Sequence, residues 1–233
     1  LSGRGELVLI GDQQQLPPTI KSFKAEKAGL GASLFERLVA ARFPLTMLKV
    51  QYRMHPAIAA FPSYAAYDNK LATGIRAEDR PSPDGFPWPT PGIPVAFVGV
   101  GTPREELETM VTGGSKANFR ESRVVAQIVG ELLDNNGFAP EDVAVITPYV
   151  GQLRQLETEL KRHQVAKSEL LLNTVDAFQG KECEVVVIST VRSNFAGRVG
   201  FLADHRRLNV AITRARRGLI VVGHEATLLN DRV

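Results

Sequence analysis

Short runs of apolar, mostly β-branched residues alternate with helical patterns along this chain of 233 residues. The strand-like runs are residues 7–10, 45–50, 95–100, 143–147, 170–174, 184–190 and 219–223, and the helical patterns are 32–41, 120–135, 152–163 and the segments that begin at Pro56 and Arg206. Strands joined through helices pair in parallel, because each crossover helix returns the chain to the same edge of the sheet. We therefore predict an α/β fold, with a mostly parallel sheet and helices on both faces.

The composition is that of a globular protein, with 44% hydrophobic residues and no apolar run of the length that spans a membrane. The first residues read as a strand and a turn rather than as a signal peptide, so we predict an intracellular protein, cytoplasmic or nuclear, with no membrane segment. A single cysteine, Cys183, excludes an internal disulfide, and four scattered histidines argue against a structural zinc site. Because Cys183 adjoins an apolar run, we expect a buried thiol.

Positive charge is concentrated at the C-terminal end. The net charge is only +3, but residues 190–233 contain eight arginines against three acidic residues. This asymmetry favours an anionic partner, either a nucleotide or a nucleic acid.

Five of these arginines lie in the segment 206–218, RRLNVAITRARRG. At the helical repeat Leu208, Ala211, Ile212 and Ala215 share one apolar stripe. Arg207 and Arg214 lie two turns apart along its edge, and a role for Arg207 is left open. An arginine at the rim of a cleft can place a fixed positive charge on a phosphoryl group, so Arg214 is a candidate phosphate ligand. A solvated basic helix face is the alternative.

Other unusual residues follow predicted strands, where parallel α/β sheets bind ligands. The polar run 12–15, which ends in Gln15, follows the first strand, although a solvated loop explains it equally well. Tyr52 and Arg53 follow the second strand and combine a flat aromatic face with a planar cation, which suits a base and a phosphate. His55 is expected to form local hydrogen bonds at a helix start.

Two further segments are predicted to be turns or loops. Gly180 would let the backbone approach a ligand, and Glu182 could bind a ribose, although a tight turn between strands also explains Gly180. The proline-rich segment 80–94 is expected to be an extended loop anchored by Phe86 and Trp88. The polar, glycine-rich segment 101–118 is predicted to be a loop.

Four segments, in this order, resemble motifs III to VI of superfamily 1 helicases, in the branch of the nonsense-mediated mRNA decay helicase and senataxin. They are GDQQQLPP (11–18), QYRMHP (51–56), VDAFQGKE (175–182) and LNVAITRAR (208–216). The resemblance implies two RecA-like domains, with ATP in the cleft between them and single-stranded nucleic acid across the top. Residues 1–44 are then a remnant of the first domain, and 45–233 are the second.

The resemblance also implies roles for single residues. Gln15 would contact the γ-phosphate, Arg53 and Arg214 would act as arginine fingers, and Tyr52 would stack on the adenine. Gly180 and Glu182 would line the phosphates and the ribose. Six residues lie in segments that would face the strand: Pro148, Tyr149, Thr174, Ser189, Arg192 and Asn194.

The sequence departs from a complete helicase in one respect. Neither the GxxxxGK[ST] phosphate loop nor a Walker B acidic pair occurs in it. We expect the Mg²⁺ ligands and the catalytic base in sequence that precedes Leu1, and little ATP hydrolysis by this chain alone. Two alternatives are a catalytically inert RecA-like module that holds single-stranded nucleic acid and, less well supported, a nucleotide kinase. The motifs do not distinguish RNA from DNA.

Overall fold

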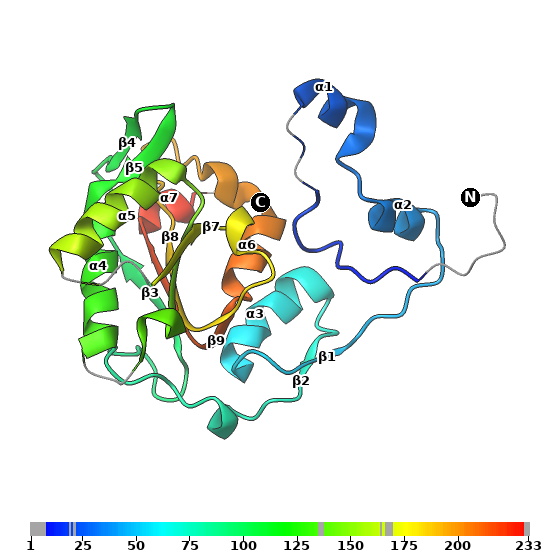
Figure 1. Cartoon of the computed structure of the whole chain (residues 1–233), viewed down its shortest axis with the longest axis horizontal. Coiled ribbons are helices and arrows are strands. Elements are labelled where there is room, and N and C mark those ends of the chain that lie inside the picture. Colours follow the sequence, from blue (N-terminus) through cyan, green and yellow to red (C-terminus); the bar gives the residue numbers. More distant parts are fainter. Residues whose placement is uncertain are drawn as a thin grey trace.

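A computed structural model describes residues 8–18, 20, 22–134, 138–163, 165 and 170–230. Most of these residues form a layered α/β body, while the segment before β1 (Val50–Gln51) extends to one side of it (Figure 1). That segment contains α1 (Phe23–Ala25), the π-helical turn η1 (Glu26–Leu30) and α2 (Leu34–Ala40). The predicted division of the chain after residue 44 stays a prediction.

The centre of the body is a five-stranded sheet in the order β3-β9-β8-β6-β7, and every neighbouring pair is parallel. Its strands are β3 (Val95–Gly99), β6 (Val143–Thr147), β7 (Leu171–Thr174), β8 (Cys183–Ser189) and β9 (Ala215–Gly223). The helices are α3 (Pro56–Tyr67), α4 (Phe119–Asp134), α5 (Val150–Arg162), α6 (His205–Ile212) and the short α7 (Glu225–Leu228). Single 3-10 turns are η2 (Ala77–Asp79), η3 (Pro140–Asp142), η4 (Asp176–Phe178) and η5 (Gly200–Ala203).

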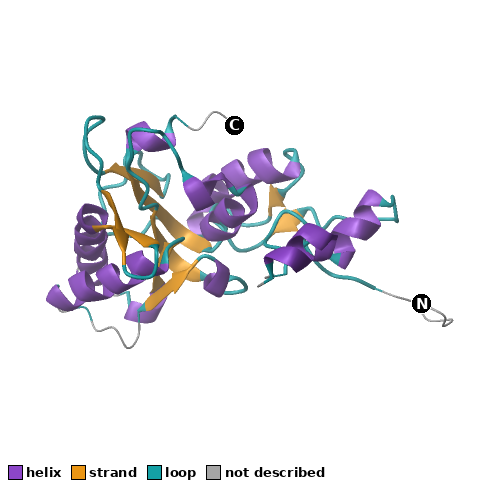
Figure 2. Ribbon diagram, turned by 90° about the horizontal axis from the view of Figure 1, so that it is seen from above, coloured by secondary structure: helices purple, strands orange, loops and turns teal. Residues whose placement is uncertain are grey.

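Helices cover both faces of this sheet, as predicted (Figure 2). Alternate residues of β8 point to opposite faces: Val185 and Val187 join a core with α4 and α5, whereas Val186 and Ile188 join a core with α3 and α6. All five residues of β6 are buried. A strand buried on both faces needs apolar side chains at every position, which is why these runs were readable from the sequence.

Two predicted strands near the start of the chain are wrong in whole or in part. Residues 8–10 are not in a strand, and Val8 and Ile10 are 80% and 94% exposed. The predicted strand 45–50 is reduced to β1, which pairs in parallel with β2 (Ala72–Thr73). A strand requires a hydrogen-bonded neighbour, and among the described residues nothing pairs with 8–10.

The predicted loop 101–118 contains an antiparallel hairpin instead. Its strands are β4 (Glu108–Val111) and β5 (Ser115–Asn118), and Val111 pairs with Ser115 across the turn. Gly113 and Gly114 have φ values of 88° and 73°, in the left-handed region that favours glycine. Polar side chains on both strands conceal this hairpin in the sequence.

Several local predictions are confirmed. The predicted helix 32–41 is present as α2, and a capping box of Ser33 and Glu36 begins it. Pro56 is the first residue of α3, and His55 Nδ1 accepts a hydrogen bond from the Ala57 amide at 3.1 Å. In the proline-rich loop the rings of Phe86 and Trp88 meet edge to face at 4.9 Å and pack on the core. Within the described residues no helix is long and apolar enough to cross a membrane.

Candidate functional site

The predicted site residues lie at two opposite edges of the parallel sheet. The amino edge is formed by the amino ends of the strands, and the carboxyl edge is formed by their carboxyl ends. Glu182 and Arg214 immediately precede β8 and β9, whose first residues are paired with each other. Arg192 and Asn194 follow β8 at the carboxyl edge, and Tyr149 follows β6 there. We call the first set the amino-edge cluster (Arg53, Glu182, Arg214). The second set is the carboxyl-edge cluster, which consists of Tyr149, Arg192, Asn194 and the side chains that contact them or line the same cavity.

In the amino-edge cluster two arginines converge beside one carboxylate. Arg53 forms an ion pair with Glu182, and its Nη1 donates to the Thr213 carbonyl at 3.0 Å. Arg214 donates from Nε to the Val210 carbonyl at 2.9 Å, from Nη1 to the Lys181 carbonyl at 3.3 Å and from Nη2 to Thr213 Oγ1 at 3.0 Å. The resulting cation pair shares contacts with Thr213, at the end of α6.

Arg214 is buried rather than at an open rim, with only 2% of its surface exposed. Helix α6 ends at Ile212, so Arg214 lies in the turn before β9. Burial lowers the pKa of Arg214 to about 10, and the nearby charge of Arg53 contributes to this shift. The guanidinium therefore remains charged at neutral pH, in a place where an added anion would be stabilising.

Tyr52 and Gly180 lie on more open parts of this edge. The side of the Tyr52 ring packs against Gly74, where a Cβ would come within 2.3 Å of the ring, and the residue is 68% exposed. Gly180 has a φ of 83°, and no atom lies within 4 Å of the position of an added Cβ. Its left-handed backbone is what a tight turn requires, and the space beside it is open.

Gln15 is held by local contacts that connect the N-terminal segment to the body. Its Nε2 donates to Asp12 Oδ2 at 2.9 Å, and the Tyr67 hydroxyl donates to the same oxygen at 2.7 Å. Burial and the hydrogen bond to Asp12 raise the pKa of Tyr67 to about 12. Asn209 of α6 donates to the Gln14 carbonyl at 2.9 Å, so the polar run 12–15 is attached to the helix that leads to Arg214.

The carboxyl edge contains a cavity of about 810 Å³ between the β4–β5 hairpin, the start of α5 and η5. Tyr149 and Arg192 line it, as do four residues that the sequence reasoning missed or left undecided: Lys116, Arg154, Phe201 and Arg207. The rings of Tyr149 and Phe201 meet edge to face at 5.4 Å, and the guanidinium of Arg207 lies 5.1 Å from the Phe201 ring centre. Basic side chains that alternate with aromatic rings are typical of a nucleic-acid site. These side chains come from four separate segments, so the pattern is not visible along the sequence.

The remaining candidates for strand contact do not line this cavity. Pro148 is half-buried between β6 and α5, and Thr174 Oγ1 accepts from the Ala177 amide at 3.3 Å. Ser189 is fully buried and donates to Glu121 Oε2 at 2.7 Å, so from this position its hydroxyl supports the sheet end rather than reaching a ligand. Asn194 is held by Glu108 and by the Arg198 carbonyl.

The described residues contain no group of three or more His, Cys, Asp or Glu side chains that could hold a metal ion. The buried thiol predicted for Cys183 is confirmed, with 4% of its surface exposed. Burial raises its pKa to about 11, which makes it a poor nucleophile at neutral pH.

A protein-family model described as an AAA domain matches residues 30–226. The chain belongs to this family. It is 43% identical, over 97% of its length, to the regulator of nonsense transcripts 1 homolog of Neurospora crassa, and 40% identical, over 99%, to the ATP-dependent helicase NAM7 of Saccharomyces cerevisiae. The probable helicase MAGATAMA 3 of Arabidopsis thaliana is 38% identical over 97%. The resemblance to this helicase branch is confirmed, and so is the RecA-like α/β fold class.

The chain spans only part of these relatives: 21%, 24% and 28% of their respective lengths. Among solved structures, the C-terminal domain of a possible DNA helicase from Lactobacillus plantarum matches 76% of this chain and 92% of its own length, with a TM-score of 0.43 and 12% identity. The sequence relatives therefore provide the stronger comparison.

Proposed function

We propose that this chain is the C-terminal motor half of an ATP-dependent helicase that translocates on single-stranded nucleic acid. The amino-edge cluster would supply two arginine fingers, and the carboxyl-edge cluster would supply part of the strand-binding surface. The observation that carries the proposal is the buried Arg214, whose three hydrogen bonds go to carbonyls and a hydroxyl while a second cation, Arg53, lies nearby.

The amino-edge residues fit ATP. When bound, ATP supplies the phosphoryl group that is transferred to water. Arg53 and Arg214 would neutralise its phosphate oxygens, Tyr52 would stack on the base through its exposed ring, and the open backbone at Gly180 would lie near the phosphates. Glu182 would exchange its ion pair with Arg53 for ribose hydroxyls, and Gln15 would couple the γ-phosphate to the body. The Mg²⁺ ligands are proposed to lie outside this chain.

The carboxyl-edge cavity fits single-stranded nucleic acid. Lys116, Arg154, Arg192 and Arg207 line it together with Tyr149 and Phe201. Cations bind the phosphates and aromatic rings stack on bases of any sequence, so RNA and DNA are both compatible with it. An intracellular location, cytoplasmic or nuclear, stays a prediction.

The test is ATP hydrolysis by the full-length protein with Arg214→Ala or Arg53→Ala. Loss of an arginine finger is expected to lower turnover by about 10³- to 10⁵-fold. Arg217→Ala is the matched control, because Arg217 belongs to the same basic segment but donates to the Pro81 carbonyl and lies over the Phe138 ring. If Arg214→Ala retained more than about half of the control's turnover, the finger role would be wrong.

A catalytically inert strand-binding module is the second candidate, because cations and aromatic rings line the carboxyl-edge cavity, away from the amino-edge cluster. Fluorescence anisotropy with a labelled single-stranded oligonucleotide should show affinity that falls steeply with salt for either candidate. Strand binding by a full-length protein that hydrolyses no ATP would favour the inert module.

A further inference from the structure

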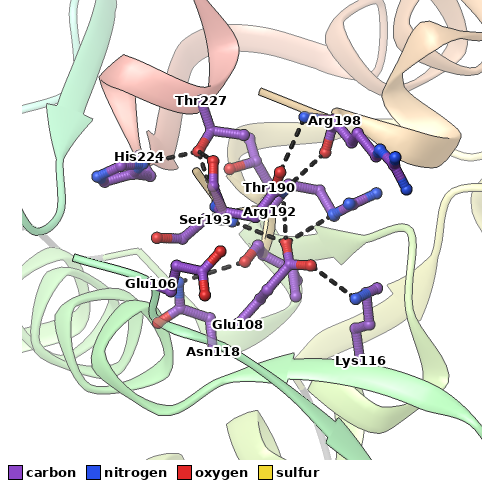
Figure 3. Close-up of polar contacts among 12 residues, drawn as sticks. Glu106, Glu108, Lys116, Asn118, Thr190, Arg192, Ser193, Arg198, His224 and Thr227 are labelled. Atoms are coloured by element: carbon purple, nitrogen blue, oxygen red, sulfur yellow. Dashed lines mark hydrogen bonds and ion pairs between the residues drawn. The ribbon is translucent and has the colours of Figure 1, made fainter. Parts of the chain in front are cut away.

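We propose that Glu108 of the β4–β5 hairpin is a positioning residue for strand binding, because it fixes the donors of the carboxyl-edge cluster. This inference rests on the proposed function and assigns a role to a carboxylate that neither the helicase motifs nor the cavity lining includes. Figure 3 shows Glu108 at the centre of side chains from β4, β5 and the loop after β8.

Four donors converge on this one carboxylate. Glu108 Oε2 accepts from Arg192 Nε at 2.7 Å, from the Ser193 amide at 3.0 Å and from Asn194 Nδ2 at 3.0 Å. Glu108 Oε1 accepts from Lys116 Nζ at 2.6 Å. Only 10% of the Glu108 side chain is exposed. Charge-assisted hydrogen bonds in such a place are strong and directional, so they hold both cations in one arrangement.

The protonation state of Glu108 agrees with this role. Burial by itself would raise its pKa, but the hydrogen bonds from Arg192, Lys116 and Asn194 outweigh burial and hold the pKa at about 2. The carboxylate is therefore ionised at any physiological pH, and it is an acceptor for all four donors.

The residues just before β4 also hold the loop that follows β8. The Leu107 amide donates to Ser193 Oγ at 3.0 Å, and the Phe195 amide donates to Glu106 Oε1 at 2.9 Å. On the other side of the loop, Thr227 Oγ1 accepts from the Asn194 amide at 2.9 Å. The loop is thus held between the hairpin and α7, with Glu108 on the hairpin side (Figure 3).

The loop leaves β8 through an unusual backbone conformation that needs such support. Val191 has a φ of 71°, which is strained for a β-branched residue. Its amide donates to the buried Glu121 carboxylate at 2.8 Å. Glu121 therefore holds the start of the loop and Glu108 holds the next three residues, so the direction of Arg192 is set from both sides.

The direction of Arg192 matters because it and Lys116 line the cavity. Arg192 Nη1 donates to the Tyr149 hydroxyl at 3.3 Å. Gly200 leaves the room for this contact, since a Cβ there would lie 2.0 Å from Arg192 Nη1 and 2.6 Å from the Tyr149 hydroxyl. Fixing long basic side chains before binding lowers the entropy cost of binding.

The negative charge of Glu108 acts on strand binding in the opposite direction to its positioning of the donors. A carboxylate beside the cavity repels phosphates, so simple electrostatics predicts that its removal tightens binding. The positioning role predicts the reverse. We expect Glu108→Gln in the full-length protein to bind a labelled single-stranded oligouridylate about tenfold more weakly, although the protein has lost a negative charge.

Glu106→Gln is the matched control. It removes the same charge from the residues just before the hairpin. Glu106 Oε1 accepts one hydrogen bond, from the Phe195 amide of the loop, and a glutamine oxygen can accept the same bond. The affinity of the Glu106→Gln variant for the oligonucleotide is expected to equal or slightly exceed that of the wild type. In the ATPase assay, Glu108→Gln should raise the oligonucleotide concentration for half-maximal stimulation and leave maximal turnover unchanged, a split that general unfolding would not produce.

A double-mutant cycle with Arg192→Lys separates positioning from a loss of stability. If Glu108 acts through Arg192, adding Glu108→Gln to Arg192→Lys costs little further affinity, whereas independent effects would add. Additive losses, or binding by Glu108→Gln at least as tight as that of the wild type, would overturn the inference while the proposed function stands. Absence of salt-dependent binding by the wild type would instead remove the proposed function and this inference with it.

Discussion

The two edges of the sheet treat buried arginines in different ways. At the amino edge, Arg214 hydrogen-bonds to two carbonyls and a hydroxyl, and its charge lies near that of Arg53. At the carboxyl edge, the Nε of Arg192 meets the carboxylate of Glu108 at 2.7 Å. The first arrangement leaves positive charge for an anion to neutralise, while the second neutralises the charge internally and fixes its direction.

The parallel sheet explains why these arrangements are separate. Strand β8 begins next to Glu182 and ends just before Thr190, so one strand connects the two clusters. Seven residues of extended chain span roughly 20 Å. A ligand at one edge therefore has no direct contact with a ligand at the other, and any coupling must pass through the strands and the helices packed on them.

The largest expected effect is a difference in stability between variants of Arg192 and of Arg214. Arg192→Met leaves Glu108 buried without its main partner and is expected to destabilise the fold by about 3 kcal/mol, toward the lower end for a broken buried pair because Lys116 remains. Arg214→Met removes a buried cation that is unfavourable by itself, and this gain offsets the lost hydrogen bonds, so a change within about 1 kcal/mol is expected. Urea unfolding measures both. Equal losses would show that the two edges do not differ in this way.

A pH dependence should separate the two buried carboxylates of the carboxyl edge. Burial raises the pKa of Glu121 to about 7, from a usual value of 4.5. The folded state then holds the proton more tightly than the unfolded state, so stability falls by about 3 kcal/mol as pH rises from about 4.5 to 7. The pKa of Glu108 is shifted the other way, to about 2, so its contribution is lost as pH falls below about 4.5.

Thermal melting from acid to neutral pH measures this contrast. Glu121→Gln should flatten the neutral limb alone, and Glu108→Gln should flatten the acid limb alone. If Glu121→Gln left the neutral limb unchanged, the wild-type carboxyl would be ionised throughout that range, contrary to its burial.

The smallest effect is expected for an ion pair that belongs to neither edge. Arg206 Nη2 of α6 lies 2.5 Å from Glu36 Oε1 of α2, and 29% and 20% of the two side chains are exposed. Partly solvated pairs contribute less than about 1 kcal/mol and are weakened by salt. A double-mutant cycle with Arg206→Ala and Glu36→Ala measures the pair by itself. A coupling energy as large as that between Glu108 and Arg192 would show that burial does not set the strength of these ion pairs.

Much of the fold follows from local patterns. Strands β3, β6, β7 and β8 were predicted to within one residue at each end, because strands buried on both faces are apolar throughout. Strand β9 was predicted at 219–223 but begins at Ala215, within the segment that was predicted to be helical. The end of α6 was different: its apolar stripe suggested a longer helix, but Thr213 closes it and Arg214 enters the turn before β9. The hairpin was missed because its strands carry polar side chains such as Lys116 and Asn118.

The sequence by itself determined the parallel sheet, its two helical layers, the buried Cys183 and the four helicase-like segments, since each of these is encoded by neighbouring residues. Only the tertiary structure showed that the candidate site residues divide between two opposite edges of the sheet. It alone showed that Arg214 is buried, and that Glu108 gathers donors from positions up to 86 residues away in the chain. The physical reason is that hydrogen bonds and charge compensation depend on distance in space, which the spacing of residues along the sequence does not encode.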